Sequence, residues 1–282
     1  MTTATVGILH PGEMGVSIAA SAQNGGSQVL WASERRGPAT RARAEEHHLE
    51  DAKTLANLCA RCEVILSVCP PHAAEEQALR VLAAGFRGLY LDANAISPQR
   101  VAALAARFAQ AGAGFVDGGI IGGPAWKPRS TYLYLSGPRA AEVAGLFSAG
   151  PLETRLLGDE PGKASALKMA YAAYTKGSTA LLCAVLAAAE GLGVRADLEG
   201  HWTLEDPASP GRAEGRVRGV TAKAWRFAGE MDEIAATFRS AGLPGEFHAA
   251  AAEIYRRISG FKDAQALPAL EDVLRALRQK ND

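Results

Sequence analysis

Short apolar runs alternate with longer stretches of helical spacing through the first half of the chain. The apolar runs predict strands at residues 5–9, 28–31, 64–68, 88–92 and 114–116, with further strands at 131–136 and 154–157. Helical stretches lie between them, at 14–23, 40–46, 52–59, 74–82 and 98–111. Strands that alternate with helices are typical of βαβ units and a parallel sheet. Because the strands are almost wholly apolar, we expect helices on both faces of this sheet.

The pattern changes after residue 157, where no further strand is indicated. A long helix is predicted at 162–191, entered after Pro161, and later helices at 217–241, 245–258 and 267–279. The prolines and glycines of 205–215 predict a loop. The fold class is therefore α/β, with an N-terminal Rossmann domain at 1–158 and a C-terminal all-α domain at 159–282.

Length and charge narrow the classes of partner. The 282 residues suit one large domain or two of ordinary size. Thirty basic and thirty acidic residues cancel, so the basic excess typical of nucleic-acid binding is missing, and we expect no nucleic-acid partner. The first residues lack a basic segment followed by an apolar one, which favours the cytoplasm. The longest uncharged apolar run, 177–189, is shorter than the roughly 20 residues of a membrane span, so we expect no membrane partner.

Three of the four cysteines have a spacing that could bind zinc. Cys59, Cys62, Cys69 and His72 read C-x2-C-x6-C-x2-H. However, Cys69 closes a predicted buried strand and the other two cysteines fall on or beside the preceding helix, whereas structural zinc knuckles are carried by loops. We therefore predict reduced thiols and no metal.

A glycine-rich turn follows the first strand and opens the first helix. It occupies the place where a Rossmann domain carries G-x-G-x-x-G. Gly12 would let the backbone approach a pyrophosphate, Gly15 would let the helix pack on the strand, and the helix N-terminus offers N–H groups to phosphates. An ordinary tight turn is the alternative. The residues predicted to hold a dinucleotide here are His10, Pro11, Gly12, Glu13 and Met14.

The end of the second strand suggests which dinucleotide. An NAD enzyme usually places an acidic residue there for the ribose 2′-hydroxyl. This chain instead has guanidinium and hydroxyl groups, which suit a 2′-phosphate: Ser33, Arg35, Arg36 and Thr40. NADP is therefore the predicted cofactor. Glu34 leaves NAD possible, and a solvated start of a helix is the alternative interpretation.

Three segments together resemble the β-hydroxyacid dehydrogenase superfamily, which includes 6-phosphogluconate and 3-hydroxyisobutyrate dehydrogenases and the related imine reductases. The first is VGILHPGEMG at 6–15, the second is VDGGIIGG at 116–123, and the third is GKASALKM at 162–169. The strand end DANAISP at 92–98 adds to the resemblance to 6-phosphogluconate dehydrogenase. The resemblance covers most of the chain and is weakest after residue 200.

The resemblance implies a role for particular residues. Lys168 would be the catalytic general acid or base, and Gly118 and Gly119 would bind the substrate through backbone N–H groups. The residues that would line the cofactor are Ser67, Val68, Cys69 and Asn94, the last beside the nicotinamide ribose. Because Lys168 lies in an apolar helix, burial would lower its pKa toward neutrality, as proton transfer requires.

Two residues depart from the pattern of the hydroxyacid dehydrogenases. Asp117 stands where they commonly have serine and where imine reductases often have aspartate, and Ala172 stands where they usually have asparagine. Asp117 either contacts an amine or hydroxyl of the substrate or caps the glycine-rich segment. Tyr171 shares the helix face of Lys168 and either assists proton transfer or packs at an interface. Asp117 and Tyr171 are therefore candidate catalytic residues beside Lys168.

Together these features predict hydride transfer between NADP and a small hydroxy acid or its carbonyl counterpart. An imine reductase and a non-catalytic NADP-binding scaffold are the alternatives. The resemblance also implies a homodimer. The aromatic and methionine side chains of the helical half either pack that dimer or form a plain helical core: Trp225, Phe227, Met231 and Phe238.

Overall fold

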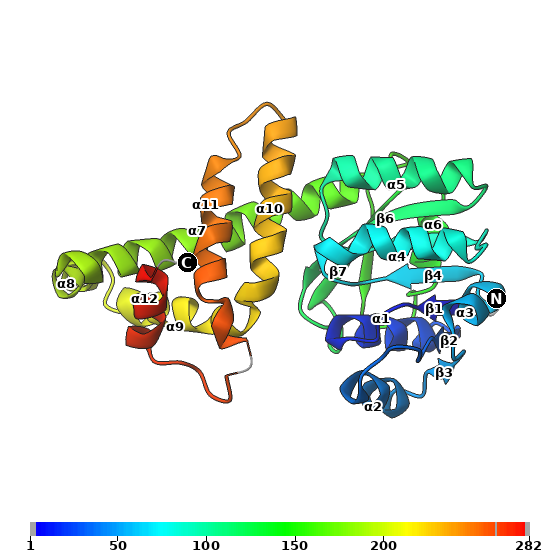
Figure 1. Ribbon diagram of the computed structural model, residues 1–282, viewed down its shortest axis with the longest axis horizontal. Coiled ribbons are helices and arrows are strands. Elements are labelled where there is room, and N and C mark those ends of the chain that lie inside the picture. The colour runs from blue at the N-terminus through cyan, green and yellow to red at the C-terminus, as the bar shows by residue number, and fades with distance from the viewer. Residues whose placement is uncertain (1–3, 263, 280–282) are drawn as a thin grey trace. The chain divides into compact units, whose positions relative to one another are not determined.

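The computed structural model describes residues 4–262 and 264–279. The chain divides into two compact units, Met1–Met169 and Ala170–Asp282. The first holds the sheet and the second is helical (Figure 1). The predicted fold class is confirmed. The first unit extends past the proposed domain boundary at 158 and includes the first two turns of a long helix.

One eight-stranded sheet forms the first unit, in the order β3-β2-β1-β4-β5-β6-β7-β8. Every neighbouring pair is parallel except β6 and β7. The strands are β1 (Thr5–Ile8), β2 (Gln28–Trp31), β3 (Glu50–Asp51), β4 (Val64–Ser67), β5 (Leu89–Asp92), β6 (Gly114–Gly122), β7 (Thr131–Ser136) and β8 (Glu153–Leu156). The carboxyl ends of β2, β1, β4, β5 and β6 therefore meet at one edge. The order in which strands are added to the sheet reverses between β1 and β4, and doubly wound folds bind ligands at this point.

Helices cover both faces of the sheet, as the apolar strands predict. One face packs against α1 (Glu13–Asn24), α2 (Pro38–Glu46) and α6 (Ala140–Gly145). The other packs against α3 (Leu55–Arg61), α4 (Pro71–Ala83) and α5 (Pro98–Gln110). Alternate residues of a strand enter opposite cores. In β4, for example, Val64 and Leu66 face the first set of helices and Ile65 faces the second.

The helical unit differs from the prediction in three places, the first being an unpredicted helix, α8 (Arg195–Glu205). Residues 205–215, expected to be a loop, include the first half of α9 (Ser209–Gly219). Pro210 lies in the first turn of that helix, where a missing N–H costs nothing, and Asp206 accepts the Ala208 N–H just before it. The helix expected at 217–241 is broken: α9 ends, the 3-10 turn Thr221–Lys223 follows, and α10 (Ala224–Ser240) begins anew.

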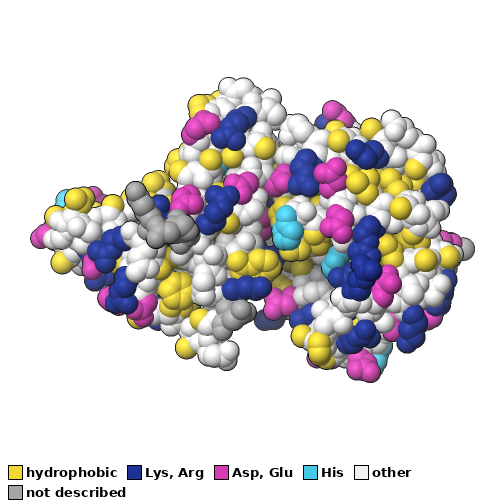
Figure 2. All heavy atoms as spheres, in the orientation of Figure 1, with side chains coloured by type: hydrophobic (Ala, Val, Ile, Leu, Met, Phe, Trp, Pro, Cys, Tyr) yellow, Lys and Arg dark blue, Asp and Glu magenta, His cyan; other side chains and the backbone are white. Residues whose placement is uncertain are grey.

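The remaining helices are α7 (Lys163–Leu192), α11 (Glu246–Arg257) and α12 (Leu270–Arg278), with a 3-10 turn at Ser259–Phe261. The 30-residue α7 is long and apolar enough to cross a membrane by length and composition alone, although the apolar run within it is shorter. Half of its most apolar window is buried within the protein. On the face shown in Figure 2, acidic and basic side chains are interspersed over both units.

Candidate functional site

The glycine turn joins β1 to α1 at the carboxyl edge of the sheet. A Cβ at Gly15 would lie 2.0 Å from the His10 carbonyl oxygen, so only glycine allows the helix to start so close to the strand. A Cβ at Gly12 would meet nothing within 4 Å, which leaves open space above the turn. Pro11 is buried, Met14 packs partly on the core and Glu13 is exposed. The turn therefore has the close packing and the open backbone that a bound pyrophosphate requires.

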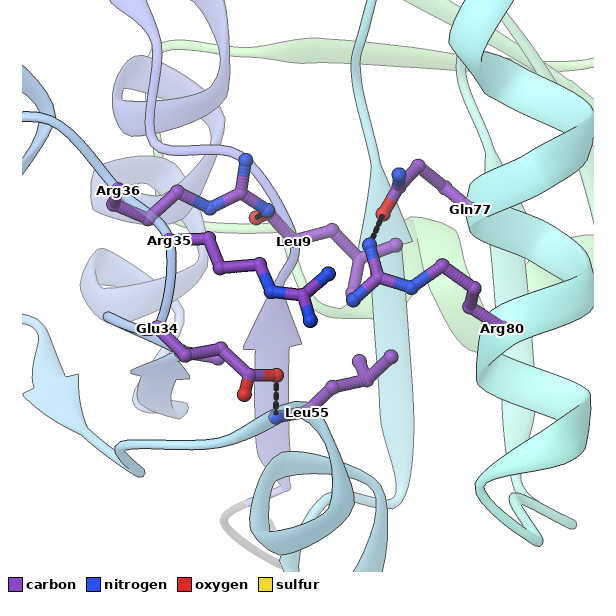
Figure 3. Close-up of a pocket in the computed structure, with 8 residues that line it drawn as sticks. Leu9, Glu34, Arg35, Arg36, Leu55, Gln77 and Arg80 are labelled. Atoms are coloured by element: carbon purple, nitrogen blue, oxygen red, sulfur yellow. Dashed lines mark hydrogen bonds between the residues drawn. The ribbon is translucent and has the colours of Figure 1, made fainter.

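A pocket beside this turn gathers three arginines (Figure 3). Arg35 and Arg36 come from the loop after β2, and Arg80 comes from α4. The backbone of Arg35 has a φ of 56°, in the left-handed region that non-glycine residues seldom occupy and that clusters at functional sites. The pocket is lined by Leu9, Ala32, Glu34, Arg35, Arg36, Leu55, Gln77 and Arg80.

The charges in and beside this pocket favour an anion. Burial and the positive charge of Arg80 lower the pKa of Arg36, and burial with the charges of Arg36 and Arg80 lowers the pKa of His10 to about 4. His10 is therefore neutral at pH 7. Among the described residues, the buried Nε of Arg36 has no hydrogen-bond partner. Guanidinium groups that repel one another in this way are suited to bind a phosphate between them.

Glu34, the residue that leaves NAD possible, is turned toward α3. Its carboxylate accepts the Leu55 N–H at 2.9 Å, at the N-terminus of that helix (Figure 3). The carboxylate is thus already engaged by a helix N-terminus, although Glu34 still lines the pocket.

Arginine side chains, Arg36 among them, also hold the loop after β2 against the glycine turn. Arg36 donates to the Leu9 carbonyl and Arg43 donates to the Pro11 carbonyl, both at 3.0 Å. Arg41 donates to the carbonyl of Ser33 at 2.7 Å. Ser33 itself is buried, and the Thr40 N–H closes a turn on Gly37. Of the predicted 2′-phosphate residues, the structure therefore brings Arg35 and Arg36 into the pocket and uses the Ser33 backbone to hold the loop.

Sequence reasoning missed Arg80 and Gln77, which supply the far wall of the pocket. They are three residues apart on α4 and interact with each other at 3.4 Å. A polar pair at this spacing on the flank of a buried helix face is visible in the sequence. What the sequence does not contain is the strand order β2-β1-β4, which brings α4 beside the loop after β2.

The ends of β4 and β5 bring three predicted cofactor residues together. The Asn94 amide donates to the Ser67 hydroxyl at 3.1 Å, and its carbonyl oxygen accepts the Cys69 N–H at 2.6 Å. Asn94 is buried, and Val68 packs partly on the core. The amide of Asn94 therefore fixes the loop after β4 from within the protein.

Asp92, at the end of β5, is a buried acid that the sequence analysis did not single out. One carboxylate oxygen accepts the Asn94 N–H at 3.1 Å, and the other has no partner among the described residues. Burial raises the pKa of Asp92 to about 7. The folded state therefore holds a proton that the unfolded chain releases above about pH 4, so stability is lost as the pH rises through 7.

Replacing Asp92 by asparagine is expected to stabilise the protein at alkaline pH. Asp92→Asn removes a charge that burial disfavours, and the rise of the Asp92 pKa to about 7 sets an upper limit of about 4 kcal/mol on the gain at pH 8. Urea unfolding at pH 8 and pH 4 measures this difference. At pH 4 both proteins hold a neutral group and the gain should vanish. A variant that is less stable than the wild type at pH 8 would contradict this account.

The two glycines on β6 allow close packing on both sides: Gly119 against the first turns of α7 and Gly118 against β5. A Cβ at Gly119 would lie 2.5 Å from the Ala164 carbonyl oxygen, and one at Gly118 would lie 2.9 Å from Leu91. The partly buried Lys168 reaches the same strand, where its amine donates to the Ile120 carbonyl oxygen at 2.6 Å. Three residues predicted for the substrate site therefore lie together at the end of β6.

The other two predicted catalytic residues have different surroundings. Asp117 is fully buried, and its carboxylate accepts hydrogen bonds from Ser136, Gly162 and Ser165. Burial raises the pKa of Asp117, and these donors oppose the rise. Tyr171 lies one turn beyond Lys168 on α7 and is 48% exposed.

The zinc-like spacing does not produce a cluster. Within the described ranges, no three His, Cys, Asp or Glu side chains gather as metal ligands. Cys59 and Cys62 are buried free thiols, and burial raises their pKa values to about 11 and 12. Such thiols are protonated at neutral pH and are poor nucleophiles.

Comparisons with known proteins agree with this geometry. Residues 5–144 match the NAD-binding domain of 6-phosphogluconate dehydrogenase, and residues 189–258 match a domain of unknown function, DUF1932. No curated protein matches the sequence. A conserved hypothetical protein from Sinorhizobium meliloti 1021 is 26% identical, with 98% of this chain and 96% of the other covered and a TM-score of 0.69.

Two enzymes of known activity share the fold at lower identity. Mycobacterium tuberculosis 3-hydroxyisobutyrate dehydrogenase is 17% identical over 99% of this chain and 100% of its own, with a TM-score of 0.69. A reductive aminase from Aspergillus terreus, in complex with NADPH and ethyl levulinate, is 20% identical over 98% and 100%, with a TM-score of 0.56.

The fold and the glycine turn define a Rossmann protein that binds a nicotinamide dinucleotide. The first unit therefore carries an NAD-binding domain of the 6-phosphogluconate dehydrogenase type, and a DUF1932 domain lies in the helical unit. The structures that share the fold include a 3-hydroxyisobutyrate dehydrogenase and a reductive aminase. The resemblance inferred from the three sequence segments is confirmed.

Proposed function

We propose that this protein is an NADP-dependent oxidoreductase that transfers a hydride between the nicotinamide and a small hydroxy acid or its carbonyl counterpart. The observation that carries the choice of cofactor is the convergence of Arg35, Arg36 and Arg80 on one pocket beside the glycine turn. A 2′-phosphate supplies the anion that these guanidiniums require. With NAD, which lacks this phosphate, the Glu34 carboxylate would be the one acidic side chain in the pocket lining for three guanidiniums.

The chain has a suitable group for each part of the dinucleotide. The N–H groups at the start of α1 and the open space over Gly12 suit the pyrophosphate. The end of β4, held by Asn94, lies between β1 and β5 at the same sheet edge and suits the nicotinamide ribose. When bound, the nicotinamide carries the hydride.

Lys168 is the group that handles the proton. Its amine donates to the Ile120 carbonyl oxygen, and its Cβ packs against Gly119, so the side chain lies along the segment assigned to the substrate. In the direction of oxidation a neutral amine accepts the hydroxyl proton, and in reduction the ammonium returns it. The related 3-hydroxyisobutyrate dehydrogenase, solved with L-serine, supports a small hydroxylated acid as the substrate class.

Imine reduction is the second candidate. Ala172 in place of asparagine favours it, as do the NADPH-bound reductive aminase and an imine reductase among the structures with this fold. Asp117 gives it no support, because its carboxylate is buried and bonded to backbone and serine groups.

A cofactor titration followed by a substrate panel tests the proposal. Fluorescence titration should show tighter binding of NADPH than of NADH. Hydroxy acids with NADP, and carbonyl compounds or imines with NADPH, then identify the chemistry. Tight NADPH binding with no turnover across the panel would instead support a non-catalytic scaffold, and equal affinities for the two cofactors would reject the phosphate site.

A homodimer is part of the proposal, and α7 offers the surface for it. Within the helical unit, exposed positions on α7 follow heptad spacing, and the apolar ones are 37–79% exposed: Tyr171, Tyr174, Leu181, Val185 and Leu192. A second copy presents the same stripe, as a two-fold interface requires.

The four aromatic and methionine residues expected either in a dimer or in a helical core pack within their own unit, where Met231 is fully buried and Phe227 contacts Tyr255.

A charge on this stripe should separate the two copies. Leu181→Glu is expected to convert a dimer into a monomer of 29.5 kDa, because it places a carboxylate in an apolar seam. Sedimentation equilibrium measures the mass. Leu243→Glu is a matched control, because Leu243 is 54% exposed, close to the 51% of Leu181, but does not belong to α7. A wild-type protein that sediments as a monomer would reject the interface.

A further inference from the structure

The buried carboxylate of Asp117 is bonded to the first turn of α7. Its Oδ2 atom accepts the Gly162 N–H at 2.9 Å and the Ser165 N–H at 3.0 Å. Its Oδ1 atom accepts the Ser165 hydroxyl at 2.6 Å. Asp117 itself belongs to β6, so these bonds join the strand to the N-terminus of a helix that is 45 to 48 residues away in the sequence. A negative charge at a helix N-terminus is stabilising.

A second strand takes part in the same network. The Ser136 hydroxyl, at the end of β7, donates to Asp117 Oδ2 at 3.0 Å and accepts the Ala164 N–H at 3.1 Å. Of the four N–H groups from 162 to 165, which a helix start can leave without partners, three are thus satisfied: those of Gly162, Ala164 and Ser165. All these groups lie in the sheet unit.

The lysine of the proposed mechanism lies on the next turn of the same helix. Lys168 follows Ser165 by three residues and shares its face. Its amine donates to the Ile120 carbonyl on β6, the strand that also carries Asp117. Because Gly119 allows Ala164 and Lys168 to approach β6, the helix is held at close range between the two contacts.

We propose that Asp117 is a positioning residue, whose carboxylate, together with Ser136 and Ser165, holds the first turn of α7 so that the Lys168 amine lies at the end of β6. This inference rests on the proposed function for the catalytic role of Lys168. A direct chemical role is disfavoured because Asp117 is fully buried and each of its oxygens already accepts a hydrogen bond. Asp117, which stands where the hydroxyacid dehydrogenases commonly have serine, thus has a structural role.

Hydrogen exchange tests the anchor without a substrate. Asp117→Ala removes the acceptor of the Gly162 and Ser165 N–H groups, so amides in 162–165 should exchange at least about tenfold faster. Thr131→Val is the matched control, because Thr131 is equally buried on β7 and its hydroxyl donates to Gly123, away from α7. Unchanged exchange in 162–165 would overturn the proposal. If Asp117→Ala does not fold, Ser165→Ala is the second variant. It removes one donor to Asp117, and exchange in 162–165 should become faster by a smaller factor.

Kinetics on the substrate found in the panel test the consequence for Lys168. Asp117→Ala should lower kcat about 10- to 100-fold with little change in the KM for NADPH, since a misplacement of about 1 Å has effects of this size. Asp117→Asn should recover much of the rate. One carbonyl oxygen can still accept the three donors, and the new amide can donate to the Ser165 hydroxyl.

A double variant separates positioning from other roles. In a Lys168→Ala background, Asp117→Ala should cause no further fall in kcat, because the residue acts through the lysine. An equal fall in both backgrounds, or a lowered Tm with an unchanged kcat, would overturn the positioning role. If Lys168→Ala alone leaves turnover intact, the proposed function fails and with it the kinetic role of Asp117, while hydrogen exchange still decides whether Asp117 holds the helix.

Discussion

Lys168→Ala is expected to lower turnover at least about 100-fold while the affinity for NADPH stays nearly unchanged. A positioned acid or base contributes about 10²- to 10⁴-fold to a rate. The amine lies at the end of β6, bonded to the Ile120 carbonyl, whereas the residues proposed to hold the dinucleotide phosphates lie at β1, β2 and α4. Steady-state kinetics and fluorescence titration measure the two quantities on the same preparations.

Two control variants define the role of this amine. Lys168→Arg keeps the positive charge but cannot release its proton near neutral pH, so it should be nearly as slow as Lys168→Ala. Lys163→Ala removes a neighbouring, exposed lysine that pairs with Glu160, and its rate should match the wild type. Full activity in Lys168→Ala would remove this residue from the mechanism. Full activity in Lys168→Arg would leave it only an electrostatic role.

Arg80→Ala is expected to weaken NADPH binding about 10- to 100-fold and to leave NADH binding almost unchanged. A hydrogen bond to a charged group contributes about 1.5–3 kcal/mol, and only NADPH carries the 2′-phosphate that Arg80 would meet. Arg36→Ala should also reduce the preference for NADPH over NADH. Its effect is less specific, because Arg36 additionally holds the Leu9 carbonyl at the glycine turn.

The choice of control separates local contact from net charge. Arg107 is exposed on α5 and does not line the pocket, so Arg107→Ala removes one positive charge from the chain without touching this site. Its affinity for both cofactors should equal that of the wild type. If Arg80→Ala weakens NADPH and NADH to the same extent, Arg80 supports the fold of the pocket and does not read the phosphate.

The phosphate pocket illustrates how far sequence reasoning reaches. Arg35 and Arg36 could be predicted because they follow the second strand, and in a Rossmann domain the loop after that strand contacts the 2′ position of the ribose. Arg80 could not, because it is 44 residues further along the chain, and only the sheet order brings its helix alongside. The same order explains why Glu34, read as an argument for NAD, is bonded to the start of α3.

Asp117 shows the same limit at the substrate end. Its place in a glycine-rich segment predicts a functional or structural role. Of the two predicted alternatives, substrate contact and capping, the structure is nearer to capping. However, Asp117 caps the N-terminus of α7 and not the glycine-rich segment. The error over residues 205–215 has a local cause, since prolines and glycines indicate a loop unless a proline falls in the first turn of a helix, as Pro210 does.

The sequence by itself determined the alternation of strands and helices in the first half, the glycine turn at the first strand and the lysine on the long helix. These features depend on residue spacing within a few turns of chain, where apolar periodicity and glycine geometry act. Tertiary structure alone decided which distant groups meet: Arg80 with Arg36, Asn94 with Cys69, and Asp117 with the start of α7. Such contacts follow from strand order and close packing at the sheet edge, and no short stretch of sequence contains either.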